Sequence, residues 1–129
     1  MLKIGLIGKE QTIVNLSKCA KSMGSGSLDV FATPALCALM EAAAVNSLAG
    51  VLEPGQTTVG TAISIKHTSP TATGMTVGAE SELTEIDGKR LVFKITAYDK
   101  AGVIGTAVHE RMLVDGERLM AKAAAKMGV

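Results

Sequence analysis

The spacing of apolar and polar residues divides the chain into a strand, one long helix and a run of further strands. Residues 4–16 alternate loosely between apolar and polar positions, which predicts a strand. Residues 34–49 are apolar on nearly every side of a helical wheel, so we predict a helix enclosed by the rest of the protein. Thr33 and Pro34 fit its start, because threonine caps helices and proline favours their first turn. Gly50 fits its end.

Beyond residue 56 the pattern changes to the alternation that is typical of half-buried strands. These stretches are rich in Thr, Val and Ile, and Asp87-Gly88 between two of them is a strong signal for a hairpin turn. Before the helix, the Gly- and Ser-rich residues 22–28 predict a loop. The predicted strands are 57–68, 75–85, 89–98 and 103–114, and residues 116–126 are predicted to form a short helix.

The order of these elements predicts an α+β fold, in which a curved antiparallel sheet wraps around one long central helix. Residues 1–129 are expected to form a single domain, since this length is typical of one. The four strands after the helix are expected to form one amphipathic meander on which the helix packs. Such a layer leaves a sheet edge and a helix end uncovered, so we predict a homodimer or higher homo-oligomer.

Composition argues against several classes of function. The net charge is +1, with no Trp, one Tyr and two Phe, so a basic face and stacking aromatics are lacking and no nucleic-acid partner is predicted. Cys19 and Cys37 are too few for a Cys-rich metal cage, and neither a metal nor a cofactor is predicted. Residues 1–9 lack the apolar core of a signal peptide, and no uninterrupted apolar stretch reaches membrane-spanning length. We therefore expect a cytoplasmic protein without a membrane partner.

Glu41 is the most unusual residue of the predicted helix, because it lies within a run of Ala, Leu, Met and Val. Burying an ionised carboxylate is costly unless the group is paired or hydrogen-bonded. Glu41 is therefore expected either at an edge of the helix or held in a site. A carboxylate in apolar surroundings is a candidate for chemistry.

Six short stretches, spread over the start of this helix, its middle and the strands that follow it, occur in a characteristic order. They are Val30-Phe-Ala-Thr-Pro34, Leu39-Met-Glu-Ala42, Leu52-Glu-Pro-Gly55, Gly60-Thr-Ala-Ile63, Lys66-His-Thr68 and His109-Glu-Arg111. In their joint order and spacing the chain resembles the hotdog-fold acyl-CoA thioesterases, and among them the group of fluoroacetyl-CoA thioesterases. The likeness runs from about residue 25 to about residue 115, which is most of the chain.

The resemblance implies a catalytic site made of Thr33, Glu41 and His67. Gly60 matches a glycine on the strand edge that faces the thioester carbonyl, and Arg111 matches an arginine near the site, so both are predicted to bind substrate. The implied substrate is an acyl-CoA, with coenzyme A as part of the substrate rather than a cofactor. In such folds the site usually lies at the dimer interface and uses residues of both subunits.

These residue types suit the hydrolysis of a thioester. The reaction needs a nucleophile or a base that activates water, and donors for the developing oxyanion. Glu41 can attack the carbonyl directly, giving an anhydride, or can orient and deprotonate water. His67 can act as a base or as an acid toward the leaving sulfur, and the Thr33 hydroxyl can hold Glu41 or the water. Gly60 permits a close approach of substrate to the backbone.

Taken singly, the same residues have simpler explanations. Capping of the helix is enough to explain Thr33, and a β-bulge is enough to explain Gly60. Arg111 can pair with Glu80 at the surface, and His109 is interpreted as structural. Only the ordered coincidence with the thioesterase pattern raises the catalytic interpretation above these alternatives.

The chain also departs from the pattern. Fluoroacetyl-CoA-specialised members carry aromatic residues before the helix, whereas residues 24–29 contain none, so the acyl group is left open. One alternative is a non-catalytic protein of the same fold that binds an acyl thioester or another small ligand. A hotdog hydratase is a third hypothesis, but the closely spaced Asp and His of that class are not found.

Overall fold

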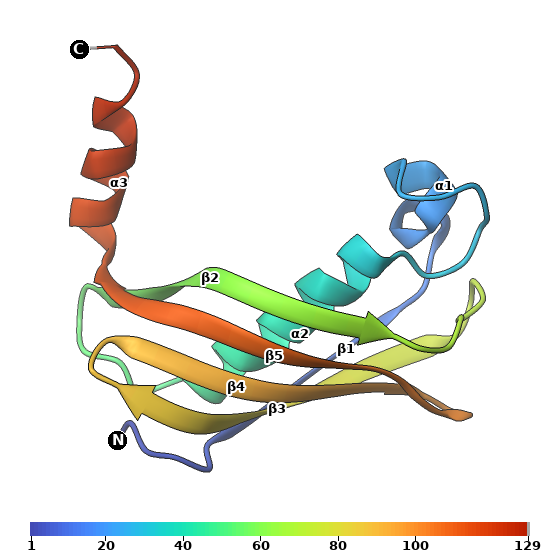
Figure 1. The fold of residues 1–129 in the computed structure, drawn as a ribbon, viewed down its shortest axis with the longest axis horizontal. Coiled ribbons are helices and arrows are strands. Elements are labelled where there is room, and N and C mark those ends of the chain that lie inside the picture. The colour runs from blue at the N-terminus through green and yellow to red at the C-terminus, as the bar shows by residue number, and fades with distance from the viewer. Residues whose placement is uncertain (129) are drawn as a thin grey trace.

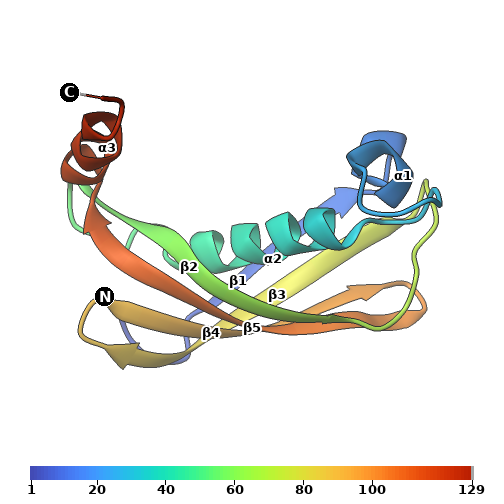
Figure 2. The same ribbon diagram turned by 45° about the horizontal axis from the view of Figure 1, so that its top comes forward.

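The computed structural model describes residues 1–128 of the chain (Figure 1). A curved antiparallel sheet holds one long helix on its concave side (Figure 2), which confirms the predicted architecture. The strands are β1 (Ile7–Ile13), β2 (Gln56–His67), β3 (Thr76–Asp87), β4 (Arg90–Asp99) and β5 (Gly102–Asp115). The helices are the short 3-10 helix η1 (Leu16–Lys18), α1 (Ala20–Met23), α2 (Thr33–Ser47) and α3 (Gly116–Ala125).

The sheet has the strand order β1-β3-β4-β5-β2, and every neighbouring pair is antiparallel. β2 does not lie beside β3 but pairs with β5, from Gln56 opposite Asp115 to His67 opposite Gly105. The prediction of one four-stranded meander was therefore wrong, and only β3, β4 and β5 form one. Residues 68–75 lead the chain past the start of α2, where Phe31 donates a backbone hydrogen bond to the Thr71 carbonyl, and on to β3.

Helix α2 is held to the sheet by an apolar side. Leu36, Met40 and Ala44 are fully buried and belong to one core with Leu83 of β3 and Phe93 of β4. Removing such large side chains from water is the main term that stabilises this arrangement.

At Gly8 the helix comes into direct contact with the backbone of β1. A Cβ atom at this position would lie 2.1 Å from the carbonyl oxygen of Ala43 and 2.4 Å from the amide nitrogen of Ser47. Both neighbours are backbone atoms that cannot turn away, so only glycine permits this close packing of strand and helix.

The opposite side of α2 is not enclosed within the described chain. Val45 is 47% exposed and Ala38 is exposed, while Cys37, Glu41 and Ala42 are half-buried. We call these five residues the open side of α2. The prediction of a helix enclosed all round was wrong for this protomer, because a single layer of sheet covers only one side of a helix.

Thr33 does not cap α2, contrary to the prediction. The helix begins at Thr33, so Ala32 occupies the cap position, and no side chain within residues 1–128 caps it. The Thr33 hydroxyl is hydrogen-bonded to His67 instead. Pro34 lies in the first turn, as predicted.

The segment before α2 contains more helix than the sequence pattern predicted. β1 is shorter than the predicted strand 4–16, and η1 and α1 follow it. These helices have three and four residues, which is too short for a helical period to show in the sequence. Gly24 then ends α1 in the left-handed conformation, with φ of 72°.

Helix α3 projects from the end of β5, away from the sheet (Figure 1). Asp115 caps it by accepting a hydrogen bond from the backbone N–H of Arg118 at 3.1 Å. None of the residues Gly116–Ala125 is buried, so the helix contributes little to the core. Within residues 1–128 we find no helix that is both long and apolar enough to span a membrane.

Candidate functional site

Two groups of polar side chains lie along α2. Thr33, Cys37 and Glu41 follow one another at intervals of four residues, so they share one side of the helix. Thr33 belongs to the first polar group, at the start of the helix. Glu41 belongs to the second, about two turns further on.

In the first group, Thr33 meets the last residue of β2. The hydroxyl oxygen of Thr33 lies 2.8 Å from Nδ1 of His67, within hydrogen-bond distance. The ring of Phe31 packs edge-on to the imidazole, with ring centres 6.4 Å apart. Nε2 of His67 is buried and has no hydrogen-bond partner within residues 1–128. An orphaned buried nitrogen of this kind is free to bond an atom of a ligand.

Burial lowers the pKa of His67 below its ordinary value of 6.5. The cause is the loss of water around the ring, which disfavours the charged imidazolium. His67 is therefore neutral at pH 7, so it can accept a proton at one nitrogen while donating a hydrogen bond from the other.

A pocket of about 220 Å³ opens beside this histidine. It is formed where α1, the loop before α2 and the loop after β2 meet. Ser25, from the Gly- and Ser-rich loop that the sequence predicted, contributes to its wall. The lining residues are Ala20, Ser25, Val30, Phe31, Ala32, Thr33, His67, Ser69 and Pro70.

In the second group, the carboxylate of Glu41 is paired with Arg111 of β5 and lies near His109 of the same strand. Its Oε2 atom lies 3.3 Å from Nη1 of Arg111 and 3.9 Å from Nε2 of His109. The side chain of Glu41 is 39% exposed at the open side of α2. Glu41 therefore lies at an exposed edge of the helix, one of the two positions expected for it, and its carboxylate has a cationic partner.

Cys37 lies one turn before Glu41 and between the two polar groups. Its sulfur atom is 3.8 Å from Oε1 of Glu41. Burial and the neighbouring Glu41 raise the pKa of the Cys37 thiol, so it stays protonated and can donate to the carboxylate.

Gly60 leaves the space that the Glu41 carboxylate occupies. A Cβ atom on Gly60 would lie 2.5 Å from Oε2 of Glu41 and 3.2 Å from the His109 ring. The register of β2 against β5 shifts between Gly60 and Ala62, so the β-bulge predicted as an alternative is present. Gly60 therefore combines a bulge with close contact to a candidate catalytic group.

Arg111 is buried and its guanidinium is fixed from several sides. Nε donates to the hydroxyl of Thr58 at 2.8 Å, and Nη2 donates to the carbonyl of Thr58 at 3.1 Å. The alternative of a surface pair between Arg111 and Glu80 was wrong, because Glu80 pairs with Lys9 at 3.9 Å and Arg111 faces inward. Desolvation lowers the pKa of Arg111, although it stays a cation.

The structure thus brings Thr33 to His67, and Glu41 to Gly60 and Arg111. Within residues 1–128 no hydrogen bond or ion pair joins Glu41 to the Thr33–His67 pair. Eight residues of helix separate the two groups, a rise of about 12 Å along the axis. Cys37, on the open side of α2, lies between the two groups along the helix.

Sequence reasoning missed the roles of His109 and Thr58 in the second group. The alternation of β5 was a usable signal, because His109 and Arg111 fall on the same inward phase as Ala107 and Leu113. The pairing of β2 with β5, which places Thr58 beside Arg111, could not be read from the pattern.

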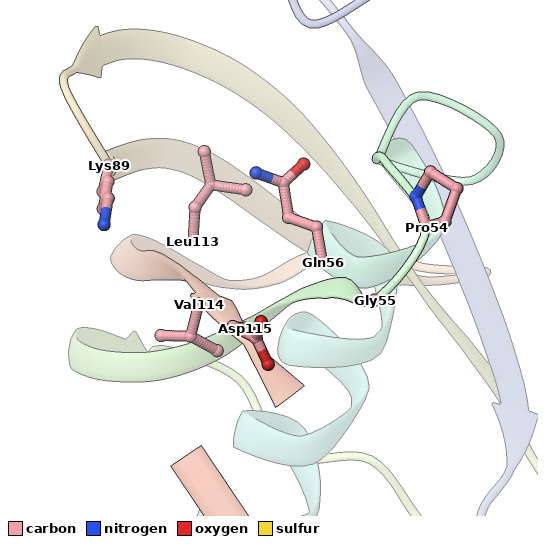
Figure 3. Close-up of a pocket in the computed structure, with 7 residues that line it drawn as sticks. All are labelled: Pro54, Gly55, Gln56, Lys89, Leu113, Val114 and Asp115. Carbon is pink, nitrogen blue, oxygen red and sulfur yellow. The ribbon is translucent and has the colours of Figure 1, made fainter. Parts of the chain in front are cut away.

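The hollow in Figure 3 lies apart from both groups. It has a volume of about 250 Å³ and is formed by the start of β2, the end of β5 and Lys89. Gln56 in its wall and His67 stand at opposite ends of β2, roughly 36 Å apart in an extended strand. The hollow therefore contributes no residue to the candidate site.

Metal-binding side chains are not gathered anywhere in the described part of the chain. Residues 1–128 hold no cluster of three or more His, Cys, Asp or Glu that could bind a metal ion. Cys19 and Cys37 are free thiols. The absence of a metal or cofactor remains a prediction from the sequence.

Comparison with known proteins gives three findings. A family described as fluoroacetyl-CoA-specific thioesterase matches residues 14–117. The fluoroacetyl-CoA thioesterase of Streptantibioticus cattleyicolor is 42% identical over 94 residues, which are 73% of this chain and 68% of that protein. A solved structure of a fluoroacetyl-CoA thioesterase superposes with a TM-score of 0.91 at 32% identity, covering 99% of each chain.

A more distant solved structure supports the fold alone. The hot-dog-like protein from Thermanaerovibrio acidaminovorans is 24% identical and superposes with a TM-score of 0.88, covering 98% of this chain and 93% of that one.

Among the structures of the fluoroacetyl-CoA thioesterase are a complex of one variant with fluoroacetate and CoA and a complex of another with acetyl-CoA.

Proposed function

Because the chain belongs to the family of fluoroacetyl-CoA-specific thioesterases and has the hotdog fold, we propose that it hydrolyses an acyl-CoA to the free acid and coenzyme A. The observation that carries the proposal is the placement of Thr33, Glu41 and His67. All three lie where the α2 helix meets strand β2 or its partner β5, and two of them are joined by a hydrogen bond. The sequence resemblance had named the same three residues.

The thioester carbonyl lies along the open side of α2 in this proposal, between the two polar groups. Water attacks the carbonyl carbon, Glu41 takes a proton from it, and the bond from carbon to sulfur breaks. The proton then passes to the departing thiolate, which leaves as coenzyme A. His67 is neutral, and its unpartnered Nε2 faces the reacting group while Nδ1 is held by the Thr33 hydroxyl.

Glu41 can serve this reaction in two ways, as a base toward water or as the nucleophile that forms an anhydride. A single turnover in heavy-oxygen water identifies the anhydride route when the label enters Glu41, because attack by water on the thioester never labels the enzyme. Attack by water places the heavy oxygen in the product acid alone. Hydrolysis of an anhydride at the Glu41 side would leave it in the Glu41 carboxylate, which mass measurement of the peptide would detect.

Coenzyme A enters as part of the substrate, and the partner is a second copy of the chain. The open side of α2 and the β2 strand, which pairs only with β5 within residues 1–128, support a homodimer. A second copy placed there would cover the apolar part of the open side. The predicted cytoplasmic location belongs to the same proposal.

The acyl group is proposed to be small or medium-sized and apolar. The pocket beside His67 has a volume of about 220 Å³ and is lined mainly by Ala, Val, Phe and Pro with two serines and one threonine. Residues 24–29 lack the aromatic side chains of fluoroacetyl-CoA specialists, so selectivity for fluoroacetate is not part of the proposal.

Release of free thiol from a panel of acyl-CoAs, from acetyl and fluoroacetyl to octanoyl, tests the proposed function. We expect turnover on at least one member, and a loss of about 100-fold or more in kcat/KM for Glu41→Gln. Glu117→Gln makes the same change on the exposed helix α3 and should keep wild-type activity. Binding of acyl-CoA without thiol release across the panel would instead establish the non-catalytic binding protein.

A further inference from the structure

His109 lies at the centre of the second polar group, although the reaction as proposed gives it no role. It is 1% exposed, and its ring packs against Phe93 with ring centres 6.1 Å apart. A buried histidine is expected to use both ring nitrogens, and His109 does so with different partners.

The two hydrogen bonds of His109 define its tautomer. Nδ1 lies 2.8 Å from the carbonyl oxygen of Ala62, which can only accept, so Nδ1 carries the proton. Nε2 lies 3.1 Å from Nη1 of Arg111, which can only donate, so Nε2 is the acceptor. The imidazole is therefore neutral and oriented in one direction.

We propose that His109 is a positioning residue, which aims the Arg111 guanidinium at Glu41 and holds the bulge that keeps Gly60 beside the carboxylate. The same Nη1 atom of Arg111 that donates to His109 also lies 3.3 Å from Oε2 of Glu41. On the other side of the ring, the Ala62 carbonyl belongs to the bulge that begins at Gly60. The His109 imidazole thus connects the bulge of β2 on one side with Arg111, the partner of the Glu41 carboxylate, on the other.

The charges around His109 agree with a neutral ring. Burial is the largest cause that lowers its pKa below 6.5, and the nearby Arg111 cation lowers it further. The Ala62 carbonyl, Glu41 and Glu110 act in the opposite direction. Protonating Nε2 would turn a hydrogen-bond acceptor into a donor that faces the guanidinium, and the orientation of Arg111 would be lost.

The inference rests on the proposed role of Glu41. Three substitutions test it by distinguishing the contributions of Nδ1 and Nε2 of His109. His109→Asn keeps a donor near the Nδ1 position, His109→Gln places an amide near the Nε2 position, and His109→Phe keeps only the shape. We expect kcat to fall about tenfold or more in the Asn and Phe variants, the size of one hydrogen bond to a charged group. The Gln variant should recover part of kcat, and KM should change less than kcat in all three.

Val108→Ala serves as the matched control, because Val108 is the preceding residue of β5 and is 49% exposed on the opposite face. Wild-type kcat in His109→Asn, or equal losses in all three His109 variants that follow their loss of thermal stability, would overturn the proposal. The second outcome would mean that His109 only fills space in the core.

The tautomer itself is measured without any substrate, by nitrogen–proton correlation spectra of the imidazole rings in the wild-type protein. We expect the protonated Nδ1, neutral Nε2 form for His109, with an Nε2 resonance that shifts in Arg111→Lys. The opposite tautomer would refute the assignment. If no acyl-CoA were hydrolysed and the spectrum still showed the expected tautomer, the proposed function would fail while the link from His109 to Arg111 stood.

Discussion

Two histidines, the half-buried His67 and the buried His109, make the stability of the protein depend on pH. The pKa values of His67 and His109 are both lowered in the folded chain, mainly by burial, from an ordinary value of 6.5 that applies when the chain unfolds. Below pH 6.5 the unfolded chain therefore binds protons that the folded chain does not. The contribution of these two histidines to the free energy of unfolding should be complete above pH 6.5. It should fall as the pH drops from 6.5 through their lowered pKa values in the folded chain.

Urea unfolding at several pH values between about 7.5 and 5.5 checks this expectation. The midpoint should move to lower urea toward acidic pH, and the shift should be smaller in His109→Asn, which loses one of the two groups. A midpoint that is constant or rises toward acidic pH would contradict it.

At the same scale, individual residues differ in how far the sequence revealed them. Glu41 stood out as a carboxylate in an apolar helix, and its ion pair with Arg111 answers the question that its position raised. The hydrogen bond between Arg111 and Thr58 joins residues 53 positions apart, and it depends on how β2 and β5 align. A one-dimensional pattern contains no such alignment, which is why this part of the site was missed.

The elements were predicted where the pattern was long and regular. Helix α2 and strands β2 to β5 fall within a few residues of their predicted bounds. The strands repeat their alternation several times, and α2 is a long apolar run with start and stop signals at its ends. The helices η1 and α1 were missed because they are too short to repeat a helical period. The start of α2 was misjudged because the Thr33 hydroxyl has a tertiary partner, His67, that competes with capping.

The packing of α2 on the sheet predicts a large difference between two methionines. Met40 is fully buried in α2, whereas Met120 is 68% exposed on α3. Met40→Ala should lower the free energy of unfolding by about 2–5 kcal/mol, because it removes apolar contacts and leaves a cavity. Met120→Ala makes the same change and should alter it by about 0.5 kcal/mol or less.

Urea unfolding of the two variants side by side measures this difference. Equal losses would show that α3 is packed as firmly as α2, against the exposed position it has in Figure 1.

For the whole molecule, the sequence predicted the architecture but not the order of the strands. A curved sheet around a helix follows from the sequence of elements, whereas the place of β2 beside β5 is set by the path of residues 68–75 past the start of α2. The predicted homodimer remains a proposal. Its physical basis is the open side of α2 together with the outer edge of β2.

Light scattering at micromolar concentration tests that dimer, and two valines provide a matched pair. Val45 lies on the open side of α2 and is 47% exposed, and Val103 lies at the start of β5 and is 55% exposed. We expect the wild type and Val103→Lys to have the mass of a dimer, and Val45→Lys to shift toward the monomer, because it buries a charge in the interface. A wild type with the mass of a monomer would count against the proposal.

The most direct test of the central claim, that Glu41 and the Thr33–His67 pair serve one thioester carbonyl, is a double-mutant cycle on kcat. Glu41→Gln, His67→Ala and the double variant are measured on the best substrate of the panel, with folding verified by thermal unfolding. Residues that act as a unit give strongly non-additive losses, so the double variant should be little slower than the slower single variant. Losses that multiply, or wild-type kcat in either single variant, would contradict the account.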